Sequence, residues 1–101
     1  MDLKIRFDRQ ARQDLLEIRR YLTEQAGAAT AERVRNHLRQ RMEQLRTRPM
    51  LGPETAEVGV RVLFPTRYPY RIYCTLIPGA AVILHIRHTS RAPRAPGRAG
   101  G

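Results

Sequence analysis

Two segments near the C-terminal end of the chain read as strands, with one short turn sequence between them. In residues 70–77 one face would carry Ile72, Cys74 and Leu76, and the other Arg71, Tyr73 and Thr75. Residues 82–87 divide in the same way, into Val82, Leu84 and Ile86 on one face and Ile83, His85 and Arg87 on the other. Because successive side chains of a strand point to opposite faces, the two segments predict an antiparallel β-hairpin with one buried face.

The turn between the two segments decides how they pair. We predict a three-residue turn at residues 78–80, because it brings the two apolar sets onto one face. The expected pairs are Leu76 with Val82, Cys74 with Leu84, and Ile72 with Ile86. A two-residue turn would shift the register by one residue and expose the apolar set. In addition, Pro-Gly lacks the positive first dihedral angle of the usual two-residue hairpin turns.

The other face of this hairpin is cationic. The predicted register makes Arg71 and Arg87 cross-strand neighbours, beside Tyr73 and His85. Like charges directly opposite each other destabilise a sheet, so an anionic partner would stabilise this face. The alternative is a solvated face, on which long arginines lie over apolar surface with their charged groups in water. The sequence leaves both interpretations open.

The composition is strongly basic. The chain has 101 residues, with 19 Lys and Arg against 9 Asp and Glu, which gives a net charge of +10. This charge favours a nucleic acid or an acidic protein as partner. A single cysteine, Cys74, excludes an internal disulfide and is expected as a small buried hydrophobe. With no segment of signal-peptide or membrane-span length, we expect a cytoplasmic protein.

The rest of the chain predicts one strand, two helices and one further strand before the hairpin. Residues 2–7 alternate as a strand, Asp8 is placed to cap a helix over residues 9–25, and Gly27 ends it. A second helix is expected to be capped within residues 28–30 and closed by Pro49, and residues 58–64 form a strand. The apolar stripes of the helices are Ala11, Leu15, Ile18 and Leu22 in the first, and Val34, Leu38, Met42 and Leu45 in the second.

These elements predict an α+β fold of order β-α-α-β-β-β, with an antiparallel helix hairpin on one face of a mostly antiparallel sheet. Residues 1–91 are expected to form a single domain. Residues 92–101 contain only Ala, Pro, Arg and Gly and are expected to be a flexible tail.

Motifs for familiar chemistry are few. The sequence has no Gly-rich phosphate loop, no paired cysteines and no HExxH motif, so we expect neither a cofactor nor a metal. His85 and His88 are three residues apart on a strand and should lie on opposite faces. A ribonuclease site needs cations for the phosphate and a group that moves a proton. The candidates for these roles are Arg71, Tyr73, His85, Arg87, His88 and Arg91.

Several segments resemble the RelE/ParE toxin superfamily of bacterial type II toxin–antitoxin systems, most closely its ParE-like, plasmid-stabilisation branch. They are FDRQARQDLLEIRRYLTEQAG (7–27), RPMLGP (48–53), YRIYC (70–74) and VILHIRHTSR (82–91). The most specific part is the combination of Ala11, Asp14, Leu15, Ile18 and Tyr21 with His88 and Arg91.

The resemblance implies a small toxin that forms a hetero-oligomer with an acidic antitoxin, expected to be of the ribbon-helix-helix type. ParE-like members poison DNA gyrase, whereas RelE-like members cleave mRNA in the ribosome. Arg71 stands where the RelE branch has a phosphate-binding arginine, and Arg87 or Arg91 stands near a later one.

Other RelE positions are not matched. Only Arg61 and Arg67 stand near the RelE lysines, no tyrosine follows Arg91, and His88 is followed by Thr89. We therefore expect a gyrase-directed toxin that acts by binding rather than by bond chemistry. The expected binding residues are Arg61, Arg67, Arg71, Tyr73, His85, Arg87, His88 and Arg91. The alternatives are a ribosome-dependent endoribonuclease using Arg71, His88 and Arg91, and a non-toxic member that only binds its antitoxin.

Overall fold

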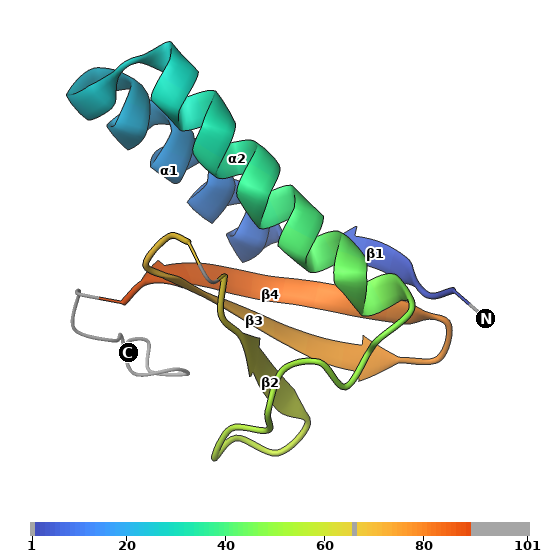
Figure 1. Ribbon diagram of the computed structural model, residues 1–101. Helices are drawn as coiled ribbons and strands as arrows, with labels where there is room; N and C mark the ends of the chain where they lie inside the picture. The colour runs from blue at the N-terminus through green and yellow to red at the C-terminus, as the bar shows by residue number, and fades with distance from the viewer. Residues whose placement is uncertain (1, 66, 90–101) are drawn as a thin grey trace.

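The computed structural model describes residues 2–65 and 67–89. Its elements follow the predicted order β-α-α-β-β-β, and the α+β prediction is confirmed (Figure 1). They are β1 (Lys4–Phe7), α1 (Arg9–Ala26), α2 (Ala28–Glu43), a 3-10 turn η1 (Gln44–Arg46), β2 (Val60–Leu63), β3 (Tyr70–Ile77) and β4 (Ala80–His88). The sheet has the strand order β1-β4-β3-β2, in which β1 runs parallel to β4 and the other pairs are antiparallel.

The two helices form a hairpin over one face of the sheet, as Figure 1 shows. The predicted apolar stripes face the sheet: Ala11, Val34, Leu38, Met42 and Leu45 belong to the core, with Leu15, Ile18 and Leu22 packed against it. None of the helices in the described part of the chain is long and apolar enough to cross a bilayer. In residues 2–65 and 67–89 no helix lies on the opposite face of the sheet, which we call the open face.

The helix ends differ in detail from the predictions. Asp8 occupies the N-cap position of α1, but its side chain makes no capping hydrogen bond within the described residues. The second helix begins directly after Gly27, whose φ of 94° lets one residue connect the two helices. The predicted cap within residues 28–30 is therefore wrong, because these residues already form the first turn of α2.

The hairpin turn differs from the prediction. Pro78 and Gly79 form a two-residue turn, so that Leu76 pairs with Ala81 and Ile77 with Ala80. Gly79 has a φ of 78°, and Pro followed by such a glycine is the sequence pattern of a type II turn. The prediction of a three-residue turn was wrong because it assumed strict alternation on both strands, whereas β4 contains a bulge.

A β-bulge restores the pairing that the shorter turn would otherwise shift. Cys74 pairs with Ile83 and Tyr73 pairs with His85, so Leu84 is an extra residue on β4. Ile83 and Ile86 are both buried in the core, whereas Val82 and Leu84, which were predicted to be core residues, are only half buried. Beyond the bulge the predicted pairs of Ile72 with Ile86 and Arg71 with Arg87 are present.

Residues 53–55 cover the outer edge of β2. Val62 donates its amide to the Pro53 carbonyl at 3.0 Å, and Thr55 donates its amide to Val60 at 2.9 Å. This arrangement requires Gly52 to pass close to the strand. A Cβ atom at Gly52 would overlap the Val62 carbonyl oxygen and would lie 2.8 Å from the Val62 carbonyl carbon.

Replacing Gly52 by alanine should therefore destabilise the fold by roughly 1–3 kcal/mol, the usual cost of forcing extra atoms into packed structure. Urea denaturation measures this change. Ala56→Ser in the same loop is the control. Because Ala56 is exposed, we expect the free energy of unfolding to change by no more than about 0.5 kcal/mol. Equal stability of Gly52→Ala and the parent protein would contradict the close approach.

Candidate functional site on the open face of the sheet

Two arginines lie directly opposite each other on the open face. Arg71 of β3 pairs with Arg87 of β4, as the sequence predicted, and both side chains are half buried. Within the described residues, neither forms an ion pair, and the Arg87 Nε atom is buried without a hydrogen-bond partner. Like charges that are cross-strand neighbours repel each other, so the pair is a candidate site for an anion.

An aromatic pair stands next to the arginines. Tyr73 and His85 are cross-strand partners whose rings stack at a centroid distance of 4.4 Å and an interplanar angle of 15°. The bulge at Leu84 makes this possible, because it puts His85 on the open face although Ile83 lies in the core. We call Arg71, Tyr73, His85 and Arg87 the open-face cluster.

Asp14 of α1 holds the strand that carries half of this cluster. Its side chain is buried, at 5% exposure, and its Oδ2 atom accepts the Ile86 amide at 2.9 Å. Gln10 Nε2 donates to the other carboxylate oxygen at 2.8 Å. β1 pairs with β4 only as far as Ile83, so Asp14 satisfies an amide on the edge that β1 leaves uncovered.

In the sequence, Asp14 was singled out only as part of the family resemblance. The signal that could have identified its role is its position among Ala11, Leu15 and Ile18 on the apolar stripe of α1. A buried acid on such a stripe needs a partner, and a backbone amide of the covered sheet can supply one.

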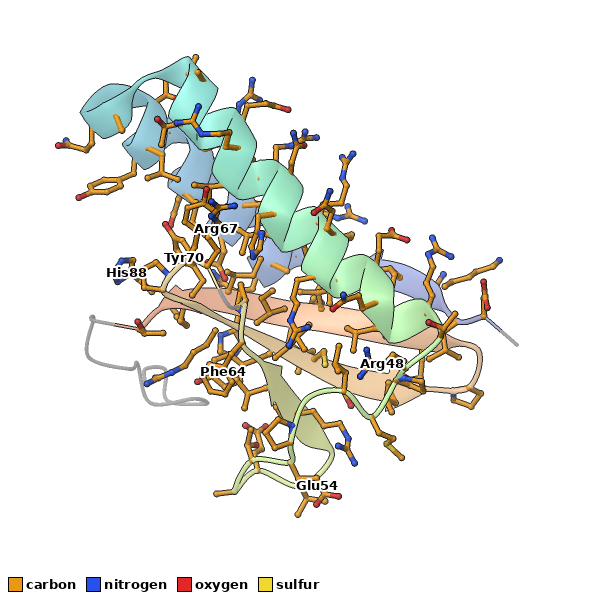
Figure 2. All side chains as sticks on the ribbon, in the orientation of Figure 1. Arg48, Glu54, Phe64, Arg67, Tyr70 and His88 are labelled. Atoms are coloured by element: carbon orange, nitrogen blue, oxygen red, sulfur yellow. The ribbon has the colours of Figure 1, made fainter. Side chains whose placement is uncertain are left out.

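The other predicted site residues lie elsewhere. Arg61 pairs with Cys74 and therefore points to the helix side, where its guanidinium donates to the Gly52 carbonyl at 2.7 Å and to Glu54 at 3.3 Å. Arg67 is exposed in the connection from β2 to β3 (Figure 2). Arg91 lies outside the described residues.

His88 also lies on the helix side, where its ring packs edge-on against Tyr70 at 5.2 Å. Figure 2 labels both residues at the same end of the sheet. Since adjacent residues of a strand face opposite ways, Arg71 and His88 lie on opposite faces. His88 therefore does not join the open-face cluster, and the predicted separation of His85 from His88 is confirmed.

The single cysteine lies in the core beneath the cluster. Burial raises the pKa of the Cys74 thiol, and the positive charge of Arg61 opposes this rise only in part. The thiol therefore stays neutral at physiological pH and is not an anionic nucleophile. The prediction of a buried hydrophobe is confirmed.

A second surface lies at the β1 edge of the molecule, between the strand and both helices. It is a groove of about 470 Å³ whose floor is apolar and includes Ile5, Phe7, Leu15 and Leu16. Leu16 is 65% exposed there. The groove is rimmed by Arg12, Arg19, Arg35 and Arg39, whereas its acid, Glu43, bonds to Arg46 at 2.6 Å. This groove is both apolar and cationic.

The chain is thus a small α+β protein with two cationic surfaces, and comparisons with known proteins identify its family. A family model described as the ParE toxin of the type II toxin–antitoxin system parDE matches residues 5–93. The chain therefore belongs to the ParE toxin family, within the RelE/ParE superfamily. The resemblance found in the sequence is confirmed.

Solved structures show the same fold. A chain of the chromosomal ParDE system from P. aeruginosa matches with a TM-score of 0.79 and 20% identity, covering 87% of this chain and 97% of that one. A chain of the toxin–antitoxin complex RelBE2 from Mycobacterium tuberculosis matches with a TM-score of 0.56 and 22% identity, covering 87% and 99%. Among curated proteins, none matches the sequence.

Removing the Asp14 carboxylate should loosen the end of β4. Asp14→Ala leaves the Ile86 amide buried without its acceptor, so we expect a loss of about 1.5–3 kcal/mol in the free energy of unfolding. Asp14→Asn keeps an acceptor oxygen and should lose less.

Urea denaturation measures the stability, and hydrogen exchange at the Ile86 amide reports the local effect. Glu17→Ala is the control, because it removes an exposed acid from the middle of the same helix, and we expect the free energy of unfolding to change by no more than about 0.5 kcal/mol. If the Ile86 amide is protected from exchange in Asp14→Ala as it is in the parent protein, the proposed hydrogen bond to Asp14 is wrong.

Proposed function

We propose that this ParE-family chain is neutralised by a co-encoded acidic antitoxin and arrests growth by binding DNA gyrase. The observation that carries the proposal is the Arg71–Arg87 pair, for which the described part of the chain supplies no acid. A partner rich in carboxylates would neutralise this pair and would be attracted by the net charge of +10.

The groove at the β1 edge suits the same antitoxin. An amphipathic segment would lay apolar side chains on the floor of the groove and set its acids against the arginine rim. The free energy gained from such contacts offsets the conformational entropy that the segment loses when it folds on binding. The structural neighbours come from toxin–antitoxin systems, which supports a hetero-oligomer, and the family resemblance favours a ribbon-helix-helix antitoxin.

Gyrase as the target is supported by membership in the ParE family. The position of His88 counts against the bond chemistry that was expected of it. Arg71 and His88 face opposite sides of the sheet, so they do not converge on one phosphate. The expected catalytic set of Arg71, His88 and Arg91 therefore gains no support from the described residues.

One observation favours a second candidate, a ribosome-dependent endoribonuclease. Tyr73 and His85 stack beside Arg71 and Arg87, so a proton-transfer group and phosphate-binding cations share one face. In this alternative His85 takes the role that the sequence assigned to His88.

A supercoiling assay with purified gyrase, run beside an in vitro translation assay with mapping of mRNA ends, separates the candidates. We expect inhibition of supercoiling with intact mRNA. Cuts in phase with codons would instead establish the ribonuclease. Neither effect, together with harmless expression, would leave a member that only binds its antitoxin.

Arg71→Ala should weaken binding of the antitoxin by about 1–3 kcal/mol, the usual loss for a charged hydrogen bond, without changing the fold. Titration calorimetry with the acidic protein encoded beside the toxin measures this affinity. Arg20→Ala is the matched control, because it removes an exposed arginine on the outer side of α1. If both variants bind like the parent protein, the open face is not part of the antitoxin site.

A further inference from the structure

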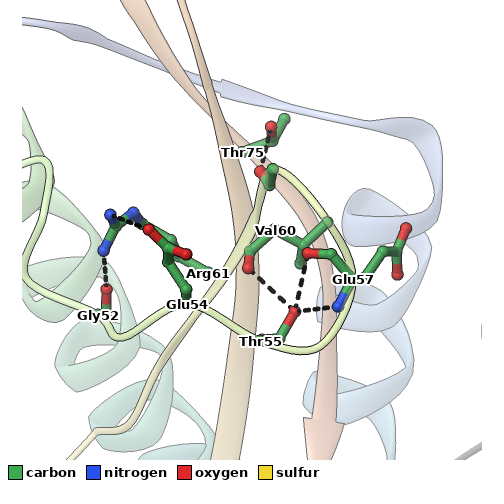
Figure 3. Close-up of polar contacts among 8 residues, drawn as sticks. Gly52, Glu54, Thr55, Glu57, Val60, Arg61 and Thr75 are labelled. Carbon is green, nitrogen blue, oxygen red and sulfur yellow. Dashed lines mark hydrogen bonds and ion pairs between the residues drawn. The ribbon is translucent and has the colours of Figure 1, made fainter.

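The loop that leads into β2 is tightly ordered by its own hydrogen bonds. Thr55 lies at its centre: its hydroxyl accepts the Glu57 amide at 3.1 Å and lies 3.0 Å from the Val60 carbonyl, to which it donates (Figure 3). The Val60 amide in turn donates to the Glu57 carbonyl at 3.1 Å. These bonds close a compact turn over residues 55–60.

Two side chains from the sheet fasten this turn to the body of the protein. The Thr75 hydroxyl donates to the Gly59 carbonyl at 2.7 Å, and Arg61 binds the Gly52 carbonyl and Glu54 (Figure 3). Gly59 adopts a φ of 81°, which favours glycine at this position. Residues 52–59 are thus fixed at both ends before any partner binds, and we call them the β2 knob.

The ordered knob presents an apolar side chain to solvent. Val58 is 98% exposed, which means that the surrounding hydrogen bonds hold a valine away from the protein. Glu57 next to it is exposed, and the Glu54 side chain is 79% exposed despite its bond to Arg61. The knob is therefore an acidic and apolar projection on a chain whose net charge is +10.

The knob lies far from the groove at the β1 edge. In the strand order β1-β4-β3-β2 the two features sit at opposite edges, and three strand spacings separate them by roughly 14 Å. Figure 1 shows the loop before β2 projecting away from α1 and α2. Glu54 and Glu57 would repel the carboxylates of an acidic antitoxin that reached the knob itself, so the knob suits a different partner.

We propose that the β2 knob is the contact by which this toxin engages its target protein, with Val58 entering a shallow apolar pocket bordered by cationic side chains. The preformed turn lowers the entropy lost on binding, and Glu57 would pair with the cations around that pocket. The inference rests on the proposed function in one respect: gyrase is the expected target.

The test compares Val58→Asp with the parent protein in two assays, growth arrest on expression in cells without antitoxin, and inhibition of purified gyrase. A charge at the tip of the knob should reduce potency at least tenfold in both. Thr75→Val, which removes the bond to Gly59 and with it one of the attachments of the turn, should give a smaller loss in the same direction. Thermal melts establish that each variant is folded.

Ala29→Asp is the matched control, because it adds the same charge at an exposed position on the helix hairpin and should leave potency unchanged. Parent-like potency of Val58→Asp in growth arrest overturns the proposal. If the parent protein arrests growth but does not inhibit gyrase, the gyrase assignment fails and the growth comparison still decides the role of the knob. A parent protein that does neither overturns both proposals.

Discussion

The buried contact between Asp14 and the Ile86 amide joins the helix layer to the part of the sheet that carries the cationic cluster. β1 ends at Phe7, which pairs with Ile83, so the remaining residues of β4 have no neighbouring strand on that side. An uncovered strand edge exposes unpaired backbone groups. By accepting one of them, α1 holds β4 directly after its bulge, and this alignment keeps Arg87 opposite Arg71.

Four of the acids have partners away from the open-face cluster. Asp14 is bound to the sheet backbone, Glu43 and Glu32 pair with arginines on the helix side, and Glu54 pairs with Arg61 at the base of the knob. The strands β3 and β4 contain no acidic residue at all. The Arg71–Arg87 pair is thus left without an acid on its own two strands, and binding of a polyanion would relieve the repulsion between these arginines.

The sequence predicts one end of the β3–β4 hairpin correctly and the other end wrongly. The far end, away from the turn, has Ile72 opposite Ile86 and Arg71 opposite Arg87, as the alternation of apolar residues predicts. The near end was predicted wrongly, because a two-residue turn and one extra residue at Leu84 together give the same far register as a three-residue turn. A bulge leaves no mark in a pattern of period two, since both strands alternate normally on either side of it. For the same reason Ile83 was assigned to the open face although it is fully buried.

By itself, the sequence determined the order of the elements, the apolar stripes of both helices, the cationic character of the hairpin and the family, because these depend on local periodicity and composition. Only the tertiary structure decided which charged residues act together. Arg61 belongs to the same basic set as Arg71 in the sequence, yet it faces the helix side and is held by Glu54. Asp14, to which the sequence assigned no structural role, positions β4. The reason is physical: the face of a strand residue depends on register, and the partner of a buried charge depends on which distant segment packs against it.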